Sequence, residues 1–574
     1  MIFLDFEVFK YDWAVVFIDV MNQKEKVIVN DRQELIDYYK ANKQRIFVGF
    51  NINHYDQYIF KGIILGMNPT DINKHIIVDK EPGWNYSEAF RNVYINIYDV
   101  FTGFNGLKTL EAFMGHSIVE TSVDFNTDRK LTESEIEEVI DYCRYDVQET
   151  IEIFMRRQDE FQTTMDLITE FNLPIYNISR SNAQLSAIVL EATRQLRRDE
   201  FKLDIPAELK LDKYDHVRRW YLNPVNHNYD RELIVDIMGV PHIFKWGGLH
   251  GAKANYIRSG KFVLVDVSSY YPSMMIQYNY HSRNIARREL FEDMYNERFR
   301  LKAEGNPKEE IFKLVLNTTY GCMGYKFNNL YDPRMRNNVC VTGQLLLLDL
   351  LESFESVPNI ELIQSNTDGI LLRYDSDTEL RHIKAITDEW SNRTRLNVGY
   401  DYFNRIIQKD VNNYIAVGEE YSAFVGGYIK DLSELDYDLP VINKALREYF
   451  INGTDPREYI ENENKLIEFQ KIVKVSRLYD YAIHNGKKLP EKTLRVFASK
   501  SESDSEVLKY RNVDGKVQTA KFANTSERSF IDNGYIVGKN IPRKLDKEWY
   551  IMLAYRRIQQ FKGEIKWFNL KDTL

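Results

Sequence analysis

The sequence is poor in cysteine and has no long apolar run. Its three cysteines, Cys143, Cys322 and Cys340, form no CxxC pair, which argues against a zinc site or a disulfide framework. No apolar stretch approaches the roughly 18 residues needed to span a bilayer. The opening residues, MIFLDFEVFK, have neither the basic lead nor the cleavage site of a signal peptide. We therefore expect a reduced, cytoplasmic protein without a membrane segment.

Positive charge is also in deficit, because the formal net charge is −9. This disfavours a simple basic coat for nucleic acid, but it allows an enzyme with a local basic channel and acid-rich centres. The chain contains no internal repeat and no low-complexity segment. Its 574 residues, of which 44% are hydrophobic, are enough for three or four domains.

Strand-like and helix-like patterns alternate along the chain, which predicts a multidomain protein that mixes α/β and α+β folds. Residues 132–158 predict a long helix, because Thr132 and Glu135 can form a capping box at its start. Residues 172–182 predict a linker, and KFVLV at 261–265 predicts a buried strand.

Carboxylates recur early in the chain, within apolar surroundings. Asp5 and Glu7 lie two residues apart in IFLDFEVF, so a strand would present both on one face. Burying two like charges is costly unless a cation compensates. Asp56 follows another apolar run, and Tyr142 and Asp146 share a helix face at i and i+4. Four carboxylates can hold two Mg²⁺ ions about 4 Å apart, with the tyrosine orienting an attacking water. The alternative is an edge strand with exposed acids and a solvated helix residue.

A second candidate lies in IELIQSNTDGILLRYD, residues 360–375, where two apolar runs flank Asn366-Thr367-Asp368-Gly369. This pattern is typical of a β-hairpin with a tight turn. Taken alone, Asp368 is a turn residue. The other interpretation is a carboxylate held at the tip of a rigid ribbon for metal-dependent phosphoryl chemistry.

Further polar residues fit this second interpretation. Asp266 stands where the KFVLV strand ends, and Pro272 is placed to open a helix. In KLVLNTTYG, Lys313, Asn317 and Tyr320 recur at i, i+4 and i+7 and so share one helix face. This stripe is either the solvent face of an amphipathic helix or a set suited to a triphosphate and a base pair.

Arg298 and Lys302 also share a helix face, at i and i+4. Like charges at this spacing cost a little on a solvated helix, whereas a polyanionic ligand makes the pair favourable. An ordinary basic surface patch is the alternative.

Taken in order, these motifs resemble those of two known families. D-x-E, N-x-x-x-Y-D and Y-x-x-x-D, within about residues 1–160, resemble the three motifs of the DEDDy 3′–5′ exonucleases. DVSSYYPS, KLVLNTTYG and NTDG resemble motifs A, B and C of the family B DNA polymerases, and the layout resembles the compact phage members. The resemblance implies an RNase H-like exonuclease domain followed by a right-hand polymerase with palm, fingers and thumb.

The implied domains are an exonuclease at 1–165, a linker region with the first part of the palm at 166–285, fingers at 286–326, the second part of the palm at 327–415, and a thumb with the C-terminal region at 416–574.

The resemblance also implies an activity and its residues. It is that of a DNA-directed DNA polymerase with proofreading, which replicates a phage genome in the host cytoplasm. Two Mg²⁺ ions would bind at each active site, with Mn²⁺ as a substitute. The implied polymerase ligands are Asp266, Asp368 and the carbonyl of Val267. The implied exonuclease residues are Asp5, Glu7, Asp56, Tyr142 and Asp146.

The remaining implied residues bind nucleotide or DNA. The nucleotide set is Tyr271, which would exclude a ribose 2′-hydroxyl, with Arg298, Lys302, Lys313, Asn317 and Tyr320. The DNA set is Asn51, Tyr55, Gly247, Gly248 and Tyr414. Primer-template DNA and dNTPs are the implied partners of a monomer, with a helicase and a single-strand binding protein as accessory proteins.

The sequence departs from the family pattern at several positions. Asn366 replaces the first aspartate of motif C, and Gly369 replaces a common serine. Lys245 stands at the tyrosine position of Tyr-x-Gly-Gly, and NNY at 412–414 keeps only Tyr414 of Lys-x-Tyr. Two alternatives therefore stay open: a 3′–5′ exonuclease with a degenerate polymerase half, and a non-catalytic DNA-binding replication factor.

Overall fold

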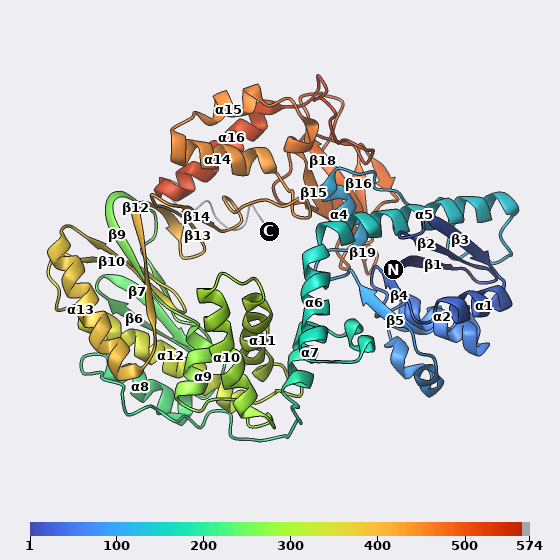
Figure 1. Ribbon diagram of the computed structural model, residues 1–574. Coiled ribbons are helices and arrows are strands. Elements are labelled where there is room, and N and C mark those ends of the chain that lie inside the picture. Colours follow the sequence, from blue (N-terminus) through green and yellow to red (C-terminus); the bar gives the residue numbers. More distant parts are fainter. Residues whose placement is uncertain (565–574) are drawn as a thin grey trace. The chain divides into compact units, whose positions relative to one another are not determined.

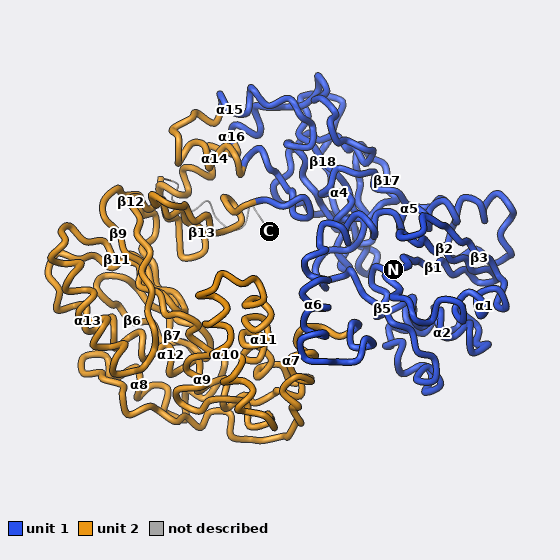
Figure 2. Tube along the Cα trace, in the orientation of Figure 1, with its two compact units in different colours: residues 1–179, 432–442, 457–552 blue, residues 180–431, 443–456, 553–574 orange. Residues whose placement is uncertain are grey.

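The computed structural model describes residues 1–564, which form two compact units (Figures 1 and 2). Unit 1 contains residues 1–179, 432–442 and 457–552. Of the described residues, unit 2 contains 180–431, 443–456 and 553–564. The first boundary lies within the expected linker at 172–182, and the multidomain mixture of helices and strands is confirmed. The finer domain ranges remain predictions.

A five-stranded mixed sheet begins unit 1, in the order β3-β2-β1-β4-β5. β1 pairs with β2, and β2 with β3, in antiparallel fashion, whereas the β1–β4 and β4–β5 pairs are parallel. Because β1 lies inside the sheet, the edge-strand alternative for its two acids is wrong. The strands are β1 (Ile2–Val8), β2 (Trp13–Asp19), β3 (Lys24–Val29), β4 (Ile46–Gly49) and β5 (Asn96–Asp99).

The alternation of β1 determines where its acids point. Leu4 and Phe6 pack in one core, whereas Phe3 packs in a second core together with residues of α5 (Glu133–Arg156). Asp5 and Glu7 share the face of Phe3 and therefore point toward α5. The predicted long helix and its capping box are confirmed.

The other helices of the first part of unit 1 are α1 (Arg32–Asn42), α2 (Asp56–Leu65), α3 (Pro69–Asn73), α4 (Leu107–Met114) and α6 (Gln158–Glu170).

Two smaller sheets belong to the later segments of unit 1. One has the order β15-β18-β21 and the other β17-β16-β19-β20. Arg495 of β18 is fully buried and donates to the carbonyls of Ala112 and His116, at 3.0 and 2.7 Å, at the end of α4. A residue near position 500 thus satisfies carbonyls near position 115, which ties these segments to the first part of the unit.

The strands of these sheets are β15 (Lys471–Lys474), β16 (Tyr481–His484), β17 (Lys487–Leu489), β18 (Thr493–Ala498), β19 (Leu508–Val513), β20 (Lys516–Lys521) and β21 (Ser529–Ile531). Three helices of this part of the chain, α14 (Pro440–Asn452), α15 (Pro456–Asn462) and α16 (Lys547–Lys562), contain residues of both units.

A nine-stranded sheet organises unit 2, in the order β14-β13-β12-β9-β11-β10-β8-β7-β6. The predicted hairpin is confirmed as β10 and β11, and its turn is closed by a 2.8 Å hydrogen bond from Asn366 N to Gly369 O. The strands are β6 (Glu232–Ile237), β7 (Val240–Lys245), β8 (His250–Ala252), β9 (Tyr256–Val267), β10 (Glu361–Ser365), β11 (Gly369–Tyr374), β12 (Val398–Asp410), β13 (Asn413–Val417) and β14 (Ser422–Val425).

The predicted strand KFVLV lies within β9, and the helix expected at Pro272 begins two residues earlier, at Tyr270. α12 is the central helix of the unit, with most of its residues buried, and Trp390 donates to the carbonyl of Leu346 at 2.9 Å. The helices are α7 (Asn182–Val189), α8 (Asp215–Leu222), α9 (Tyr270–Gln277), α10 (Arg288–Ala303), α11 (Glu309–Met323), α12 (Pro333–Phe354) and α13 (Asp377–Thr394). None of the helices in residues 1–564 has the length and apolarity that crossing a membrane requires.

Candidate active sites

The acids of the first set meet in unit 1. Carboxylate oxygens of Asp5, Glu7 and Asp146 all lie within 4.8 Å of one another. Asp56, at the start of α2, is buried beside them, and its Oδ1 accepts a 3.1 Å hydrogen bond from Phe6 N. β1, α2 and α5 therefore supply the four carboxylates that the sequence predicted.

Burial makes this cluster electrostatically costly without a cation. Desolvation, followed by the charges of Asp56 and Glu7, raises the pKa of Asp5 well above its usual range. Desolvation also raises the pKa of Asp56 to about 7 and that of Asp146 to a smaller extent. Oxygen donors at this density fit a hard divalent ion such as Mg²⁺, which would remove the repulsion.

Lys108 is a residue of this site that the sequence analysis missed. Its Nζ lies 2.6 Å from Asp146 Oδ1 and 3.1 Å from Glu111 Oε1, and 4.8 Å from the ring centroid of Tyr142. Burial opposes its charge, but the two carboxylates outweigh burial and raise the pKa of Lys108. The sequence offered one signal, a lysine in an apolar helix, but no spacing that linked it to α5.

Tyr142 lies where the motif places it. Its hydroxyl hydrogen-bonds Asp146, and burial together with that carboxylate raises the pKa of Tyr142. The hydroxyl of Tyr55 donates to Asn73 Oδ1 at 2.8 Å. Burial, followed by the charge of Asp56, raises the pKa of Tyr55. The DNA contact expected of Tyr55 remains a prediction.

Asn51 adopts a left-handed backbone, with φ of 65°. Asp99 holds this turn, because its carboxylate accepts backbone N–H groups of Asn51, Asn53 and Phe101 at 2.8–2.9 Å. Asp99 therefore organises the loop that leads to Asp56. The DNA contact expected of Asn51 remains a prediction.

The acids of the second set meet in unit 2, at the end of β9. Asp266 lies opposite Gly369 of β11 and Gly399 of β12, so neither neighbouring strand covers it with a side chain. The amide of Val267 donates to the carbonyl of Asp368 at 2.8 Å, which fixes the hairpin tip beside β9. The sheet thus brings both aspartates to one place.

The pKa values reflect this proximity. Burial, followed by the charges of Asp368 and Asp401, raises the pKa of Asp266 to about 6. Desolvation of the carboxyl group by the surrounding chain also raises the pKa of Asp368, although the residue as a whole is exposed at the turn. Asp401 was missed by the motifs. It lies opposite Leu264, two residues before Asp266, and so shares its face of the sheet.

A cavity of about 230 Å³ collects most of the remaining predicted residues of unit 2. Tyr320 contacts the lining residue Tyr271, with the two ring centroids 4.0 Å apart, and the charge of Lys302 acts on Asp266. α11 contributes Lys313 and Asn317 from one face, as the helical spacing predicted. The predicted residues that line the cavity are Asp266, Val267, Tyr271, Arg298, Lys313, Asn317 and Asp368.

The cations of this cavity are paired with acids of their own helices or with neighbouring groups. Arg298 is only 8% exposed, so the surface-patch alternative is wrong for it. Its guanidinium donates to Glu309 at 3.0 Å and to the hydroxyl of Ser269. Lys313 donates to Glu310 at 2.8 Å. An incoming polyanion would compete for cations that the chain already positions.

The hairpin tip has a partner that explains Asn366. Its Oδ1 accepts from Thr367 N at 2.8 Å and lies 3.1 Å from Nδ1 of His250. Burial lowers the pKa of His250, which favours the neutral ring, and the amide oxygen facing Nδ1 favours the tautomer that carries its proton there. Gly248 lies against the same turn, because a Cβ there would stand 2.9 Å from Thr367 Oγ1.

The other predicted DNA-binding positions of unit 2 support the sheet near this tip. The carbonyl of Gly247 accepts from Gln344 Nε2 at 2.8 Å. The hydroxyl of Tyr414, on β13, hydrogen-bonds Gln364 of β10. Their contacts with DNA remain predictions.

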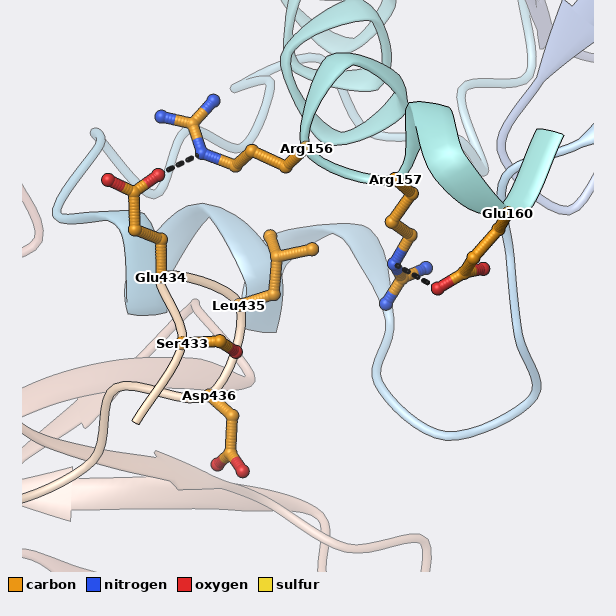
Figure 3. Close-up of a pocket in the computed structure, with 7 residues that line it drawn as sticks. All are labelled: Arg156, Arg157, Glu160, Ser433, Glu434, Leu435 and Asp436. Carbon is orange, nitrogen blue, oxygen red and sulfur yellow. Dashed lines mark hydrogen bonds and ion pairs between the residues drawn. The ribbon is translucent and has the colours of Figure 1, made fainter. Parts of the chain in front are cut away.

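A larger cavity, of about 490 Å³, lies in unit 1 apart from the predicted residues (Figure 3). Two arginines line it, and both have ionic partners. Arg156 lies 2.5 Å from Glu434, and Arg157 lies 4.0 Å from Glu160. Because these cations are already paired and no catalytic group lines the cavity, we assign it no chemistry.

Comparisons with known proteins give limited likenesses. No protein-family model matches the chain. The DNA polymerase alpha catalytic subunit of Arabidopsis thaliana is 24% identical over 152 residues, which are 22% of this chain and 10% of that protein. The match thus spans about a tenth of the length of this curated relative. The family B DNA polymerase of the archaeon Pyrobaculum calidifontis is similar in structure with a TM-score of 0.43 and 13% identity, over 99% of this chain and 78% of that one.

Proposed function

We propose that this chain is a family B, template-directed DNA polymerase of the compact phage type, with a 3′–5′ proofreading exonuclease. The observation that carries the proposal is the cavity of unit 2. It joins Asp266, at the end of β9, and Asp368, in the adjacent hairpin turn, to a lysine, an asparagine and a tyrosine from two helices. A separate buried carboxylate cluster in unit 1 supports the second activity.

In the polymerase site, Asp266, Asp368 and the carbonyl of Val267 would hold two Mg²⁺ ions, which supply the activation of the primer hydroxyl and neutralise charge on the leaving pyrophosphate. Mn²⁺ would substitute for Mg²⁺. Arg298, Lys302 and Lys313 would hold the triphosphate.

Tyr271 would exclude ribonucleotides by occupying the space of a ribose 2′-hydroxyl. The ring of Tyr271 packs against that of Tyr320, and this contact would restrict rotation of the Tyr271 side chain. Asn317 would contact the incoming nucleotide from the next turn of α11.

In the exonuclease site, Asp5, Glu7, Asp56 and Asp146 would hold two further ions, and Tyr142 would orient the attacking water. Lys108 would position the carboxylate of Asp146 and offset charge on the scissile phosphate. The mixed sheet of unit 1, with β1 at its centre, supports the RNase H-like arrangement that the resemblance implies.

Spacing supports a requirement for accessory proteins. Residues 266–313 already contain α9 and α10, and residues 317–366 contain α12 and β10, so neither interval has room for a sizeable inserted subdomain. We propose that the enzyme extends nucleic-acid primers as a monomer and relies on a helicase and a single-strand binding protein to open duplex. Products many circle lengths long on a primed circle, made without either protein, would contradict this.

The first experiment is primer extension with and without dNTPs. Extension with dNTPs and degradation without them are expected. Degradation alone would favour an exonuclease with a degenerate polymerase half, and retention alone would favour a non-catalytic DNA-binding factor. The Asn366→Asp variant is the matched test of that degeneracy, because His250 already holds residue 366 in place. We expect it to extend primers about as well as the natural chain.

A further inference from the structure

The four-stranded sheet of unit 1 has the order β17-β16-β19-β20, and Figure 1 labels β16 and β19. Its two faces carry different side chains. One face packs inward, since Ala482 and Leu489 belong to or pack against an apolar core that also contains Val507. The alternation of strands places Tyr481 and Tyr510 on the opposite face. That face is turned to solvent, and Val517 on it is 61% exposed.

A single row of side chains crosses this outer face. Tyr481 lies opposite Tyr510, which lies opposite Thr519 on the next strand. The two rings stack, with centroids 4.5 Å apart and planes 13° apart, and Lys488 Nζ lies 4.6 Å from the Tyr481 centroid. We call Lys488, Tyr481, Tyr510 and Thr519 the tyrosine row. Because Thr519 is small and exposed, a planar ring has room to continue the stack beyond Tyr510.

The charge of these strands is opposite in sign to the net charge of the whole chain. The four strands contain six basic residues and no carboxylate, whereas the protein carries a net charge of −9. By the strand register, Lys488 and Lys521 lie on the outer face and the other four on the inner face. Some of this charge is answered locally, since Lys521 lies 3.0 Å from Glu506, and Asp514 occupies the hairpin turn. On the outer face this leaves the charge of Lys488, which is complementary to a phosphate group.

We propose that the tyrosine row binds single-stranded DNA, with a base stacked on the free side of Tyr510 and the backbone running along the row so that a phosphate further along the strand lies beside Lys488. Aromatic rings on a basic sheet suit single strands, because only unpaired bases expose a π-face to stack on. A duplex would contact the basic residues through its phosphates, but its paired bases could not stack on the tyrosine rings. This binding goes beyond the proposed function, because it requires neither carboxylate centre to be active.

The test measures binding of fluorescent dT20 to the full chain in EDTA, where no turnover occurs. Tyr510→Val keeps a good strand residue, and we expect it to weaken binding by about 5- to 100-fold, the range for one lost stacking contact. Tyr510→Phe should retain binding. Tyr94→Val, at a tyrosine that is 76% exposed elsewhere in unit 1, is the matched control and should also bind normally. Unchanged binding by Tyr510→Val would overturn the proposal.

Localisation and strand preference complete the test. A 5-iodouracil oligonucleotide should crosslink to the peptide that carries Tyr510, and crosslinks confined to other peptides would overturn the proposal. Lys488→Gln should reduce the slope of log affinity against log salt by about 0.7. If Tyr510→Val weakened the binding of blunt duplex as much as that of dT20, the face would bind the DNA backbone without stacking on unpaired bases, contrary to the proposal. Primer extension on the same preparations keeps the two proposals separate, since an inactive chain that crosslinks at Tyr510 still supports this one.

Discussion

The two carboxylate centres solve the same electrostatic problem in different ways. The centre in unit 1 is buried and contains its own cation, Lys108, bonded to Asp146. The centre in unit 2 is partly open, and the two cations that line its cavity, Arg298 and Lys313, are paired with Glu309 and Glu310. The first centre is therefore largely preorganised, whereas the second has cations that a triphosphate can recruit. The difference indicates that a buried carboxylate centre needs a cationic side chain of its own. In an open centre, compensating charge can be recruited when the substrate binds.

The largest effect is expected at the open centre. Asp368→Ala should reduce primer extension by about 10³-fold or more, roughly 4 kcal/mol of transition-state stabilisation, because a metal ligand is lost. Asp375→Ala, at the far end of the same hairpin, is the control and should extend normally. Normal extension by Asp368→Ala would support the alternative interpretation, in which Asp368 is only a turn residue.

The buried centre should be separable from the open one. Asp5→Ala combined with Glu7→Ala should reduce degradation of a primer by about 10³-fold, since two ligands disappear, while extension survives. The exposed pair Glu133→Ala and Glu137→Ala serves as the control. Full degradation by the first double variant would show that the carboxylates of unit 1 are not the exonuclease centre.

The resident cation sharpens the comparison. Lys108→Gln should lower degradation by about 10- to 100-fold without changing extension, because the group that orients Asp146 is lost. Lys108→Arg should recover part of the rate. If both variants degraded primers at the natural rate, the lysine would have only a structural role.

The proposed sugar selection concerns the open centre alone. Tyr271→Val should reduce discrimination against ribonucleotides by about 10- to 100-fold, because the ring that meets the 2′-position is removed. The ratio of kcat/KM values for dCTP and CTP measures this. Tyr270→Phe, next to it, should leave the ratio unchanged, and an unchanged ratio in Tyr271→Val would contradict the steric role.

The smallest effect is on stability in the absence of metal. Asp5, Glu7 and Asp56 have raised folded-state pKa values, so their protonated forms are favoured in the fold. This stabilisation is complete below the unfolded pKa near 4 and is lost as pH rises through about 7, the pKa of Asp56. In EDTA the Tm should therefore fall by several degrees over that window. Mg²⁺ at pH 8 should restore it, and a Tm that rises with pH in EDTA would contradict the assignment.

Local patterns predicted the elements of both centres well. The period-2 placement of Asp5 and Glu7, the capping box at Thr132 and the hairpin at Asp368 each depend on neighbours in sequence, and the structure contains all three. Periodicity also predicted that Lys313 and Asn317 share a face of α11.

Contacts between distant segments were not predictable from these patterns. Lys108 meets Asp146 across 38 positions, and His250 meets Asn366 across 116. Asp401 reaches Asp266 only because β12 pairs with β9. Such partners depend on sheet order and helix packing, which no local period encodes. The burial of Arg298 was missed for the same reason, since its partner Ser269 lies on another element.

The buried guanidinium of Arg495 has a consequence for the order in which the protein is made. It satisfies the carbonyls of Ala112 and His116, yet a ribosome adds it more than 370 residues later. Until then the carbonyl of Ala112, in α4, has only the amide of Gly115 as a donor, and the carbonyl of His116 lacks the guanidinium. The carboxylate centre of unit 1 would therefore mature only after the residues of the centre in unit 2 had been synthesised. Under the proposed function, a nascent chain would not gain the nuclease centre before the residues of the polymerase centre exist.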